Sequence, residues 1–304
     1  MYIYMKMTVS RRYSKSIKLR TATSEEKSRC FLRRSDDIMD MRMFYGLTHN
    51  PFEKNSKDVT VETIDTKEMQ GRLKYLCEVK GIGVFTGNLG AGKTYNLRIF
   101  TSSLSPSLYQ VVYMPMSTLT TRQFYRYLAD SLGLEVKHSK VENFINIQSY
   151  IKRMNNEKRI TPVIIIDEAQ YLKSEILNDL KILMNFDMDS VNHCVIILAG
   201  LPALSNTLRY ASYEAIRQRI TIQYQIVGIE ADEVKNYIIK KLESAGLNVP
   251  IFTEDAYISV ANSCQGSIRK LNNIVTQCLI IGANKKCRDI NNEIVMNAVN
   301  EINM

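Results

Sequence analysis

Residues 87–94 have the composition and the spacing of a phosphate-binding loop. They read GNLGAGKT after a short apolar run and fit the pattern G-x-x-x-x-G-K-S/T at every fixed position. Glycines let successive backbone N–H groups point at one phosphate, and the helix expected to follow adds the positive end of its dipole. Such a loop predicts bound ATP and Mg²⁺, with Lys93 at the β- and γ-phosphates and Thr94 as a metal ligand. The nucleotide contacts that we expect are Gly87, Asn88, Leu89, Gly90, Ala91, Gly92, Lys93, Thr94 and Tyr95.

A pair of carboxylates ends a second apolar run. Residues 162–166 read PVIII and lead into Asp167 and Glu168. A continuous run of this kind is typical of a strand buried on both faces of a parallel sheet, and open α/β sheets bind ligands where such strands end. We expect Asp167 to hold Mg²⁺ through water and Glu168 to polarise the attacking water. The alternative is a pair that merely ends a strand and begins a helix. The upstream phosphate-binding loop favours hydrolysis.

The composition is that of a globular protein. Of the 304 residues, 45% are apolar and 23% are charged, enough for one large or two medium domains. No apolar run approaches the ~20 residues that span a bilayer, and no apolar signal core follows the basic N-terminus. The six cysteines form no C-x-x-C pair, and the three histidines show no metal-ligand spacing. We therefore expect a cytoplasmic protein with reduced cysteines and no membrane partner.

The net charge of +9 is concentrated at the N-terminus. Residues 1–42 contain eleven Lys and Arg against five Asp and Glu, a net charge of +6, which leaves +3 for the remaining chain. The charge of +3 on the remaining chain is therefore weak evidence for nucleic-acid binding. The tail has few apolar residues and no sustained period, which predicts disorder. Because Met39, Met41 and Met43 precede FYGLTHNPF, we interpret residues 1–38 as upstream sequence read in frame; a basic arm that grips DNA is the alternative.

After the tail, strand-like and helix-like segments alternate. Strands are expected near 82–86, 109–115, 162–167, 194–199 and 220–226, with helices between them. From residue 230 the strands stop, and helices are expected near 230–245, 253–264, 267–283 and 290–302. This order predicts an α/β fold, a parallel five-stranded P-loop sheet flanked by helices, followed by a small all-helical lid domain. We divide the chain into a basic tail (1–42), a nucleotide-binding domain (43–227) and a lid (228–304).

This architecture resembles the AAA+ ATPases, and residues outside the phosphate loop match that family. Residues 266–269, GSIR, open a helix as the sensor 2 motif does, which implies that Arg269 reaches the γ-phosphate; a plain surface charge is the alternative. Arg217 and Arg219 precede the fifth strand, where family members carry an arginine that enters the neighbouring subunit's ATP site. Of the two we favour Arg219, against the alternative of an ion pair within the chain.

One branch of this family is similar over roughly residues 43–304. It is the ExeA-like and TniB/IstB/TnsC-like group of bacterial ATPases. The matching segments are YGLT at 45–48, NPF at 50–52, GVFTGNLGAGKT at 83–94, VIIIDEAQ at 163–170 and LAGLP at 198–202. The resemblance implies that Asn50, Pro51 and Phe52 pack near the adenine, although packing in the core suits Phe52 equally. The compact length and the missing membrane segment favour the transposition helpers of this group.

The resemblance implies an AAA+ ATPase that forms multimers or filaments on double-stranded DNA and recruits or regulates a transposase. Its catalytic residues would be Lys93, Glu168, Arg219 and Arg269. Thr121 and Arg122 would touch the DNA backbone, unless Thr121 is a helix N-cap.

One residue departs from the pattern of the group. Leu201 stands where relatives carry a polar residue, a candidate sensor 1, so we expect slow hydrolysis unless Asn206 substitutes. Two other readings stay open. One is an ExeA-like secretion-assembly ATPase, and the other is a weakly hydrolytic scaffold gated by nucleotide.

Overall fold

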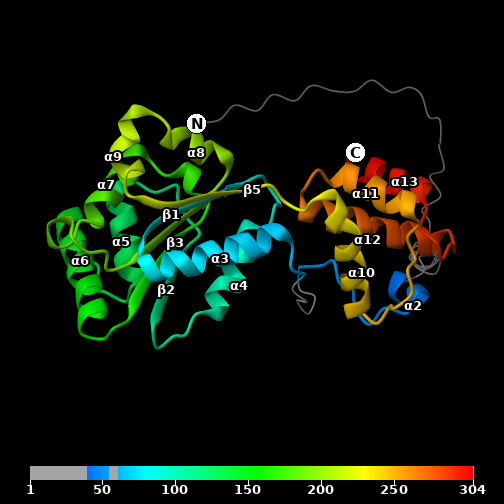
Figure 1. The fold of residues 1–304 in the computed structure, drawn as a ribbon, viewed down its shortest axis with the longest axis horizontal. Coiled ribbons are helices and arrows are strands. Elements are labelled where there is room, and N and C mark those ends of the chain that lie inside the picture. The colour runs from blue at the N-terminus through cyan, green and yellow to red at the C-terminus, as the bar shows by residue number, and fades with distance from the viewer. Residues whose placement is uncertain (1–39, 55–60, 304) are drawn as a thin grey trace, which may run out of the picture.

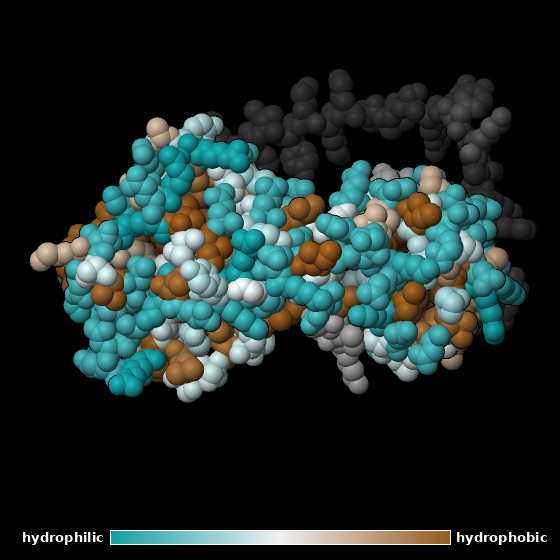
Figure 2. All heavy atoms as spheres, in the orientation of Figure 1, coloured by the Kyte–Doolittle hydropathy of each residue, from teal (hydrophilic) through white to brown (hydrophobic). Residues whose placement is uncertain are grey.

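The protein folds into two lobes (Figure 1). The computed structural model describes residues 40–54 and 61–303. One lobe contains a sheet with helices on both faces, and the other contains helices alone. The interpretation of residues 1–38 and the proposed basic arm concern residues outside the described ranges. Hydrophilic side chains cover most of the visible face of both lobes, with apolar residues scattered among them (Figure 2).

The sheet has five parallel strands in the order β2-β3-β4-β1-β5. The strands are β1 (Gly81–Gly87), β2 (Tyr109–Met114), β3 (Thr161–Ile166), β4 (Val195–Gly200) and β5 (Ile220–Ile226). Every residue of β1, β3 and β4 is buried, as central strands of a parallel sheet require. Because the strands are parallel, the loop after β1 and the carboxylates after β3 lie at the same edge of the sheet.

Helices cover the two faces of the sheet unequally. One face is packed by α3 (Ile64–Val79) and α4 (Lys93–Ser103), whose side chains contact alternate strand residues such as Phe85 and Ile165. The opposite strand residues, such as Val84 and Ile164, pack against the longer run of helices on the other face. That run comprises α5 (Thr121–Ser131), α6 (Lys140–Asn156), α7 (Ser174–Leu183), α8 (Pro202–Leu208) and α9 (Glu214–Arg217).

The second lobe is a bundle of α10 (Ala231–Ser244), α11 (Glu254–Cys264), α12 (Ile268–Asn284) and α13 (Asn292–Asn303). The short helix α2 (Met41–Tyr45) packs against α12, and Tyr45 donates a hydrogen bond to the carbonyl of Cys287 (3.0 Å). Leu47 and Phe52 are buried in the same apolar cluster. The start of the described chain therefore belongs in space to the helical lobe.

The five-stranded parallel sheet, its flanking helices and the helical C-terminal region confirm the fold expected from the sequence. Helix α2 was not expected: its first residues, 41 and 42, fall in the tail for which we predicted disorder. The division at residues 43, 227 and 228 followed chain order and stays a prediction. In space, the segment from Met41 to Phe52 lies on the helical lobe.

Candidate nucleotide-binding site

The phosphate-binding loop joins the end of β1 to the start of α4. Gly90 and Gly92 have φ angles of +78° and +100°, in the left-handed region that glycine adopts without strain. Gly87 lies so close to β5 that an added Cβ would be 2.8 Å from the carbonyl oxygen of Ile226. Gly92 caps α4 without a side chain, so its first turn opens directly onto the loop. This geometry is the backbone cradle that a phosphate group requires.

The Lys93 ammonium lies at the loop and is buried, with an exposed fraction of 6%. It donates hydrogen bonds to the carbonyl oxygens of Gly87 (2.7 Å) and Asn88 (3.0 Å). Burial lowers the pKa of Lys93, while the carboxylates of Glu168 and Asp167 act in the opposite direction. A buried cation that donates hydrogen bonds to neutral carbonyls is suited to exchange those partners for an anionic phosphate.

Asp167 and Thr94, the two residues expected to hold the metal, lie in contact. The Thr94 hydroxyl donates to Asp167 Oδ2 (3.0 Å), and Asp167 has an exposed fraction of 4%. The Tyr113 hydroxyl, from β2, donates to the same oxygen (2.8 Å). Burial, followed by the hydrogen bond to Asp167, raises the pKa of Tyr113, so this hydroxyl stays a donor. Sequence reasoning missed Tyr113, because only the pairing of β2 with β3 brings it to Asp167.

Glu168 follows Asp167 in a left-handed backbone conformation, with φ +52°. The Ser117 hydroxyl donates to the Glu168 carbonyl (2.8 Å), and the Gln170 amide donates to the Glu168 carboxylate (2.7 Å). Gln170 also accepts a hydrogen bond from the backbone N–H of Leu201 (3.0 Å). Gln170 was visible in the VIIIDEAQ motif, but its spacing alone assigned it no partner. Asn206 is exposed on α8.

The helical lobe touches the phosphate loop through the start of α12. The Ser267 hydroxyl donates to the carbonyl of Leu89 (3.2 Å), and the Arg269 backbone N–H donates to the carbonyl of Gly90 (3.3 Å). The Arg269 cation also lowers the pKa of Lys93 through repulsion between like charges. Its guanidinium is exposed, and no partner for it occurs among the described residues. Arg269 thus lies beside the phosphate loop, with its charged group available.

The two arginines that are candidates to enter a neighbouring subunit's ATP site have partners within their own chain. Arg219 forms an ion pair with Asp189 (2.5 Å), and its side chain is 15% exposed. Arg217 donates to the carbonyls of Leu208 (3.3 Å) and Arg209 (2.9 Å). Either arginine would have to leave these partners to enter a neighbouring site. The role of Arg219 in a neighbouring subunit stays a prediction.

The residues expected near the adenine belong to the helical lobe. Phe52 is buried there, with an exposed fraction of 5%. The Asn50 side chain accepts from the Phe52 N–H (3.0 Å) and donates to Glu53 (3.0 Å), which closes a local turn. Pro51 lies between them in the same turn. Their role near the adenine stays a prediction. Tyr95, in the first turn of α4, is half-buried, and its ring lies under the guanidinium of Arg98, 5.5 Å away.

The residues expected to contact DNA lie at the start of α5. The N-cap of that helix is Thr120, which forms a capping box with Gln123, so the alternative of Thr121 as N-cap is wrong by one residue. The Thr121 hydroxyl donates to Glu175 (2.7 Å), and Arg122 donates to the carbonyl of His138 (2.8 Å). Contact of Thr121 and Arg122 with DNA stays a prediction.

The site residues fit ATP with Mg²⁺. The glycine cradle, the Lys93 ammonium and the Thr94–Asp167 pair supply the backbone donors, the cation and the oxygen ligands that the group needs. Within the described ranges, no group of three or more His, Cys, Asp or Glu side chains could hold a metal unaided, so phosphate and water would complete the coordination. The buried Oδ1 of Asn96, two residues beyond Thr94, has no hydrogen-bond partner.

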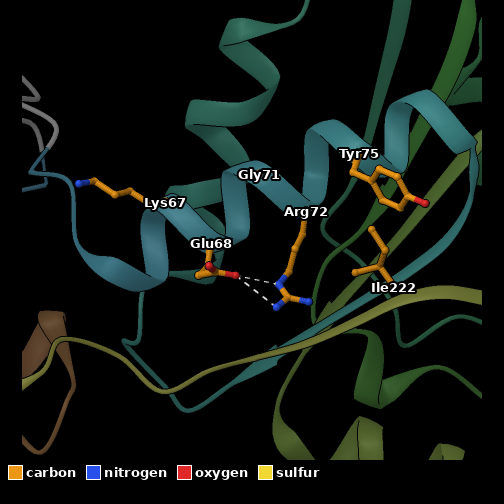
Figure 3. A pocket seen from close by; sticks show the side chains of 6 residues that line it. All are labelled: Lys67, Glu68, Gly71, Arg72, Tyr75 and Ile222. Atoms are coloured by element: carbon orange, nitrogen blue, oxygen red, sulfur yellow. Dashed lines mark hydrogen bonds and ion pairs between the residues drawn. The ribbon is translucent and has the colours of Figure 1, made fainter.

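A separate open pocket lies along α3 opposite β5 (Figure 3). It is lined by Lys67, Glu68, Gly71, Arg72, Tyr75 and Ile222, and it contains none of the expected nucleotide ligands. Arg72 pairs with Glu68 in this pocket (3.2 Å). The pocket is thus a surface feature of α3, distinct from the phosphate loop.

The comparison with protein families agrees with the nucleotide-binding site inferred from the geometry. Residues 77–208 match the family described as an AAA domain. This range begins before β1 and ends with α8, so it includes the phosphate loop, Asp167, Glu168 and Leu201. This part of the chain is therefore similar to an AAA domain, and the fold matches that of the AAA+ proteins.

Particular relatives give more detail. The chain is 27% identical over 243 residues to General secretion pathway protein A of Aeromonas hydrophila, which corresponds to 79% of this chain but only 44% of that protein. It thus spans less than half the length of this homologue. The structure of Cdc6p from Pyrobaculum aerophilum has a TM-score of 0.62 at 15% identity, and the match covers 83% of this chain and 70% of that one. Drosophila ORC, solved bound to DNA, has a TM-score of 0.60 at 15% identity, and the match covers 96% and 71%. At these identities the likeness shows a shared fold.

Proposed function

We propose that this protein binds and hydrolyses ATP with Mg²⁺, assembles on double-stranded DNA when ATP is bound, and recruits or regulates a transposase. The observation that carries the hydrolytic part is the meeting of Lys93, Thr94, Asp167 and Glu168 at one edge of the sheet. The phosphate loop alone supports nucleotide binding. The second carboxylate, Glu168, supports hydrolysis.

The proposed mechanism assigns one task to each residue. Lys93 and the loop N–H groups hold the phosphates. Mg²⁺, when bound, would neutralise phosphate charge. Thr94 would ligate the metal, and Asp167 would hold it through water. Glu168 accepts a proton from the attacking water. Arg269, exposed beside the loop, senses the γ-phosphate from the lid, so that loss of this phosphate loosens the lid.

The DNA part of the proposal rests on the transposition-helper motifs and on a structural neighbour, Drosophila ORC, that was solved bound to DNA. We expect contacts mostly to phosphates, which makes binding sensitive to salt and tolerant of sequence. Arg219 of one subunit completes the site of the next in the assembly. The protein partner would be a transposase, and the assembly would form in the cytoplasm.

A second candidate is favoured by a specific observation. The homology with General secretion pathway protein A supports a role in assembling a secretion apparatus, with an envelope protein as partner. In the described part of the chain, no helix combines the length and apolar character needed to cross a bilayer. A weakly hydrolytic scaffold gated by nucleotide is the third reading.

The test is assembly of the full chain on duplex DNA. With ATP or a non-hydrolysable analogue, gel shift and electron microscopy should show multimers on unrelated duplexes, and these should dissociate with ADP and with rising salt. Multiple-turnover phosphate release separates an ATPase from a scaffold. If the ATP-loaded protein does not bind duplex DNA at low salt, the DNA role is refuted and the secretion-assembly role becomes the favoured function. A truncation starting at Met43 keeps DNA affinity if the preceding residues take no part in binding and loses it if they are a basic arm.

A further inference from the structure

The side chain of Gln170 joins the proposed catalytic carboxylate to the end of a neighbouring strand. Its amide nitrogen donates to Glu168 Oε2 (2.7 Å), and its amide oxygen accepts from the backbone N–H of Leu201 (3.0 Å). Leu201 directly follows β4, whereas Glu168 follows β3. A single half-buried amide therefore spans the ends of two adjacent strands, with its donor on one and its acceptor on the other.

The end of β4 has room for this amide because its last residue is a glycine. A Cβ added to Gly200 would lie 2.6 Å from Gln170 Oε1 and 3.3 Å from the backbone nitrogen of Gln170. The backbone of Gly200 has no need of a positive φ, so the requirement here is for space. Gly200 and Gln170 thus form a matched pair, in which the absent side chain of one accommodates the amide of the other.

The Glu168 carboxylate depends on this contact for its orientation. Its backbone is in a left-handed conformation and is fixed by the Ser117 hydroxyl on its carbonyl (2.8 Å). Ser117 leaves the side chain free to rotate, whereas the Gln170 amide holds one carboxylate oxygen. Leu201 offers only its backbone N–H, because its side chain is apolar. Gln170 therefore supplies the polar link between the end of β4 and Glu168.

We propose that Gln170 is a positioning residue for ATP hydrolysis, which orients the Glu168 carboxylate through a hydrogen bond anchored on the Leu201 N–H. This role rests on the proposed hydrolytic function. It predicts loss of turnover without loss of ATP binding, because Gln170 acts through Glu168 and none of its contacts involves the phosphate loop. Outer contacts of this kind typically contribute about 10–100-fold to activity.

Two substitutions at position 170 separate positioning from simple structural support. Gln170→Ala removes both hydrogen bonds and should lower kcat about 10–100-fold while the Kd for ATP stays unchanged. Gln170→Glu keeps an acceptor for the Leu201 N–H but replaces the donor by an oxygen that repels Glu168. If the role is positioning, Gln170→Glu should lose turnover as severely as Gln170→Ala. If Gln170 only links this segment to β4, Gln170→Glu should retain turnover, because it keeps the acceptor for the Leu201 N–H.

Gly200→Ala and Gln148→Ala complete the set. Gly200→Ala should lower kcat because its Cβ displaces the Gln170 amide. Gln148→Ala is the matched control: the amide of Gln148 also donates to backbone carbonyls of the same domain, at Ile182 and Leu183, away from the site. It should retain parental kcat.

All variants of the full chain are compared by steady-state phosphate release, by ATP titration calorimetry and by thermal unfolding. A parental kcat in Gln170→Ala or Gln170→Glu would overturn the positioning role, and so would an equal loss of kcat and ATP affinity. If the parent protein itself shows no turnover, the hydrolytic function fails and the positioning role fails with it. The parental rate therefore distinguishes the two failures.

Discussion

Lys93 is the residue whose surroundings in this structure most clearly require an anionic ligand. Its buried ammonium contacts two loop carbonyls, and burial lowers its pKa, so the cation gains from a phosphate partner. Lys93→Ala should weaken ATP binding by roughly 10–150-fold, since hydrogen bonds to charged groups contribute about 1.5–3 kcal/mol. Titration calorimetry measures the change.

The control for that substitution is another partly buried lysine. Lys80 donates to Asn155 (2.6 Å), and its pKa is also lowered mainly by burial. It lies at the opposite end of β1 from the loop, so Lys80→Ala should keep parental ATP affinity. Equal affinity in Lys93→Ala and the parent would disprove the assignment of the phosphate loop.

Glu168 is tested by a substitution that preserves its shape. Glu168→Gln should bind ATP and DNA like the parent, because the loop is unchanged, but an amide cannot accept the proton of the attacking water. The rate should fall about 10²–10⁴-fold. Glu175→Gln, at an exposed position in the first turn of α7, is the control and should turn over normally. Parental hydrolysis by Glu168→Gln would mean that another group activates the water.

At the scale of elements, two helix glycines have opposite surroundings. Gly71 in α3 faces the open pocket of Figure 3, and an added Cβ would meet no atom within 4 Å. A Cβ on Gly282 in α12 would lie 2.2 Å from the Tyr45 hydroxyl. Gly71→Ala should raise the free energy of unfolding by about 0.5–1 kcal/mol, the usual gain in a helix. Gly282→Ala should lower it, as measured by urea denaturation.

The origin of the Gly282 effect has its own test. Tyr45→Phe removes the hydroxyl, and the nearest remaining ring atom, Cζ, lies 3.4 Å from the added Cβ. On its own, Tyr45→Phe should cost about 1 kcal/mol, the value of its hydrogen bond to Cys287. In the Tyr45→Phe background, Gly282→Ala should be much less damaging. An unchanged penalty would show that α2 does not dock on α12 as described.

The elements and the core of the site were predictable because their signals are local. The apolar runs near 82–86 and 162–167 indicated buried strands, and the phosphate-binding loop and the Asp167–Glu168 pair follow those strands directly. The contacts of Tyr113 and Gln170 depend on which strands are neighbours, and strand order is set by packing over the whole sheet. For the same reason, neither the ion pair of Arg219 with Asp189 nor the docking of α2 on α12 has a signature in the sequence.

At the scale of the assembly, Arg219 should couple subunit contact to hydrolysis. Because one side chain would serve both, Arg219→Ala should weaken ATP-dependent multimers and turnover together. Asp189→Ala is the comparison, since it removes the partner of Arg219 within the chain. A trans role predicts that Asp189→Ala retains assembly and turnover, as followed by light scattering and phosphate release. If Asp189→Ala and Arg219→Ala are equally defective, the intrachain ion pair is what matters.

The carboxylate of Asp65 ties the sheet to the connection between the two lobes. Asp65, in the first turn of α3, accepts from the Tyr224 hydroxyl on β5 (2.5 Å) and from the backbone N–H of Gly228 (2.7 Å). Gly228 has a φ of +109°, and a Cβ there would lie 2.0 Å from the carbonyl oxygen of Gly266, so this connection tolerates only glycine. Asp65 therefore ties the sheet to the segment on which the helical lobe turns.

Asp65→Asn keeps the volume of the side chain but turns one acceptor into a donor that faces another donor. We expect the free energy of unfolding to fall by about 1.5–3 kcal/mol, as for hydrogen bonds to charged groups. Limited proteolysis should also cut faster at the connection, where Val227 is already 68% exposed. Asp232→Asn, on the exposed first turn of α10, is the control: it should change neither the free energy of unfolding nor the rate of cleavage.

Because Arg269 reaches the phosphate loop only when the lobes keep their present arrangement, a loosened connection should also lower ATP turnover. If Asp65→Asn is cleaved and turns over like the parent, other contacts hold the lobes, such as those of Ser267 and Arg269 with the loop and that of Glu233 with the Ile64 N–H.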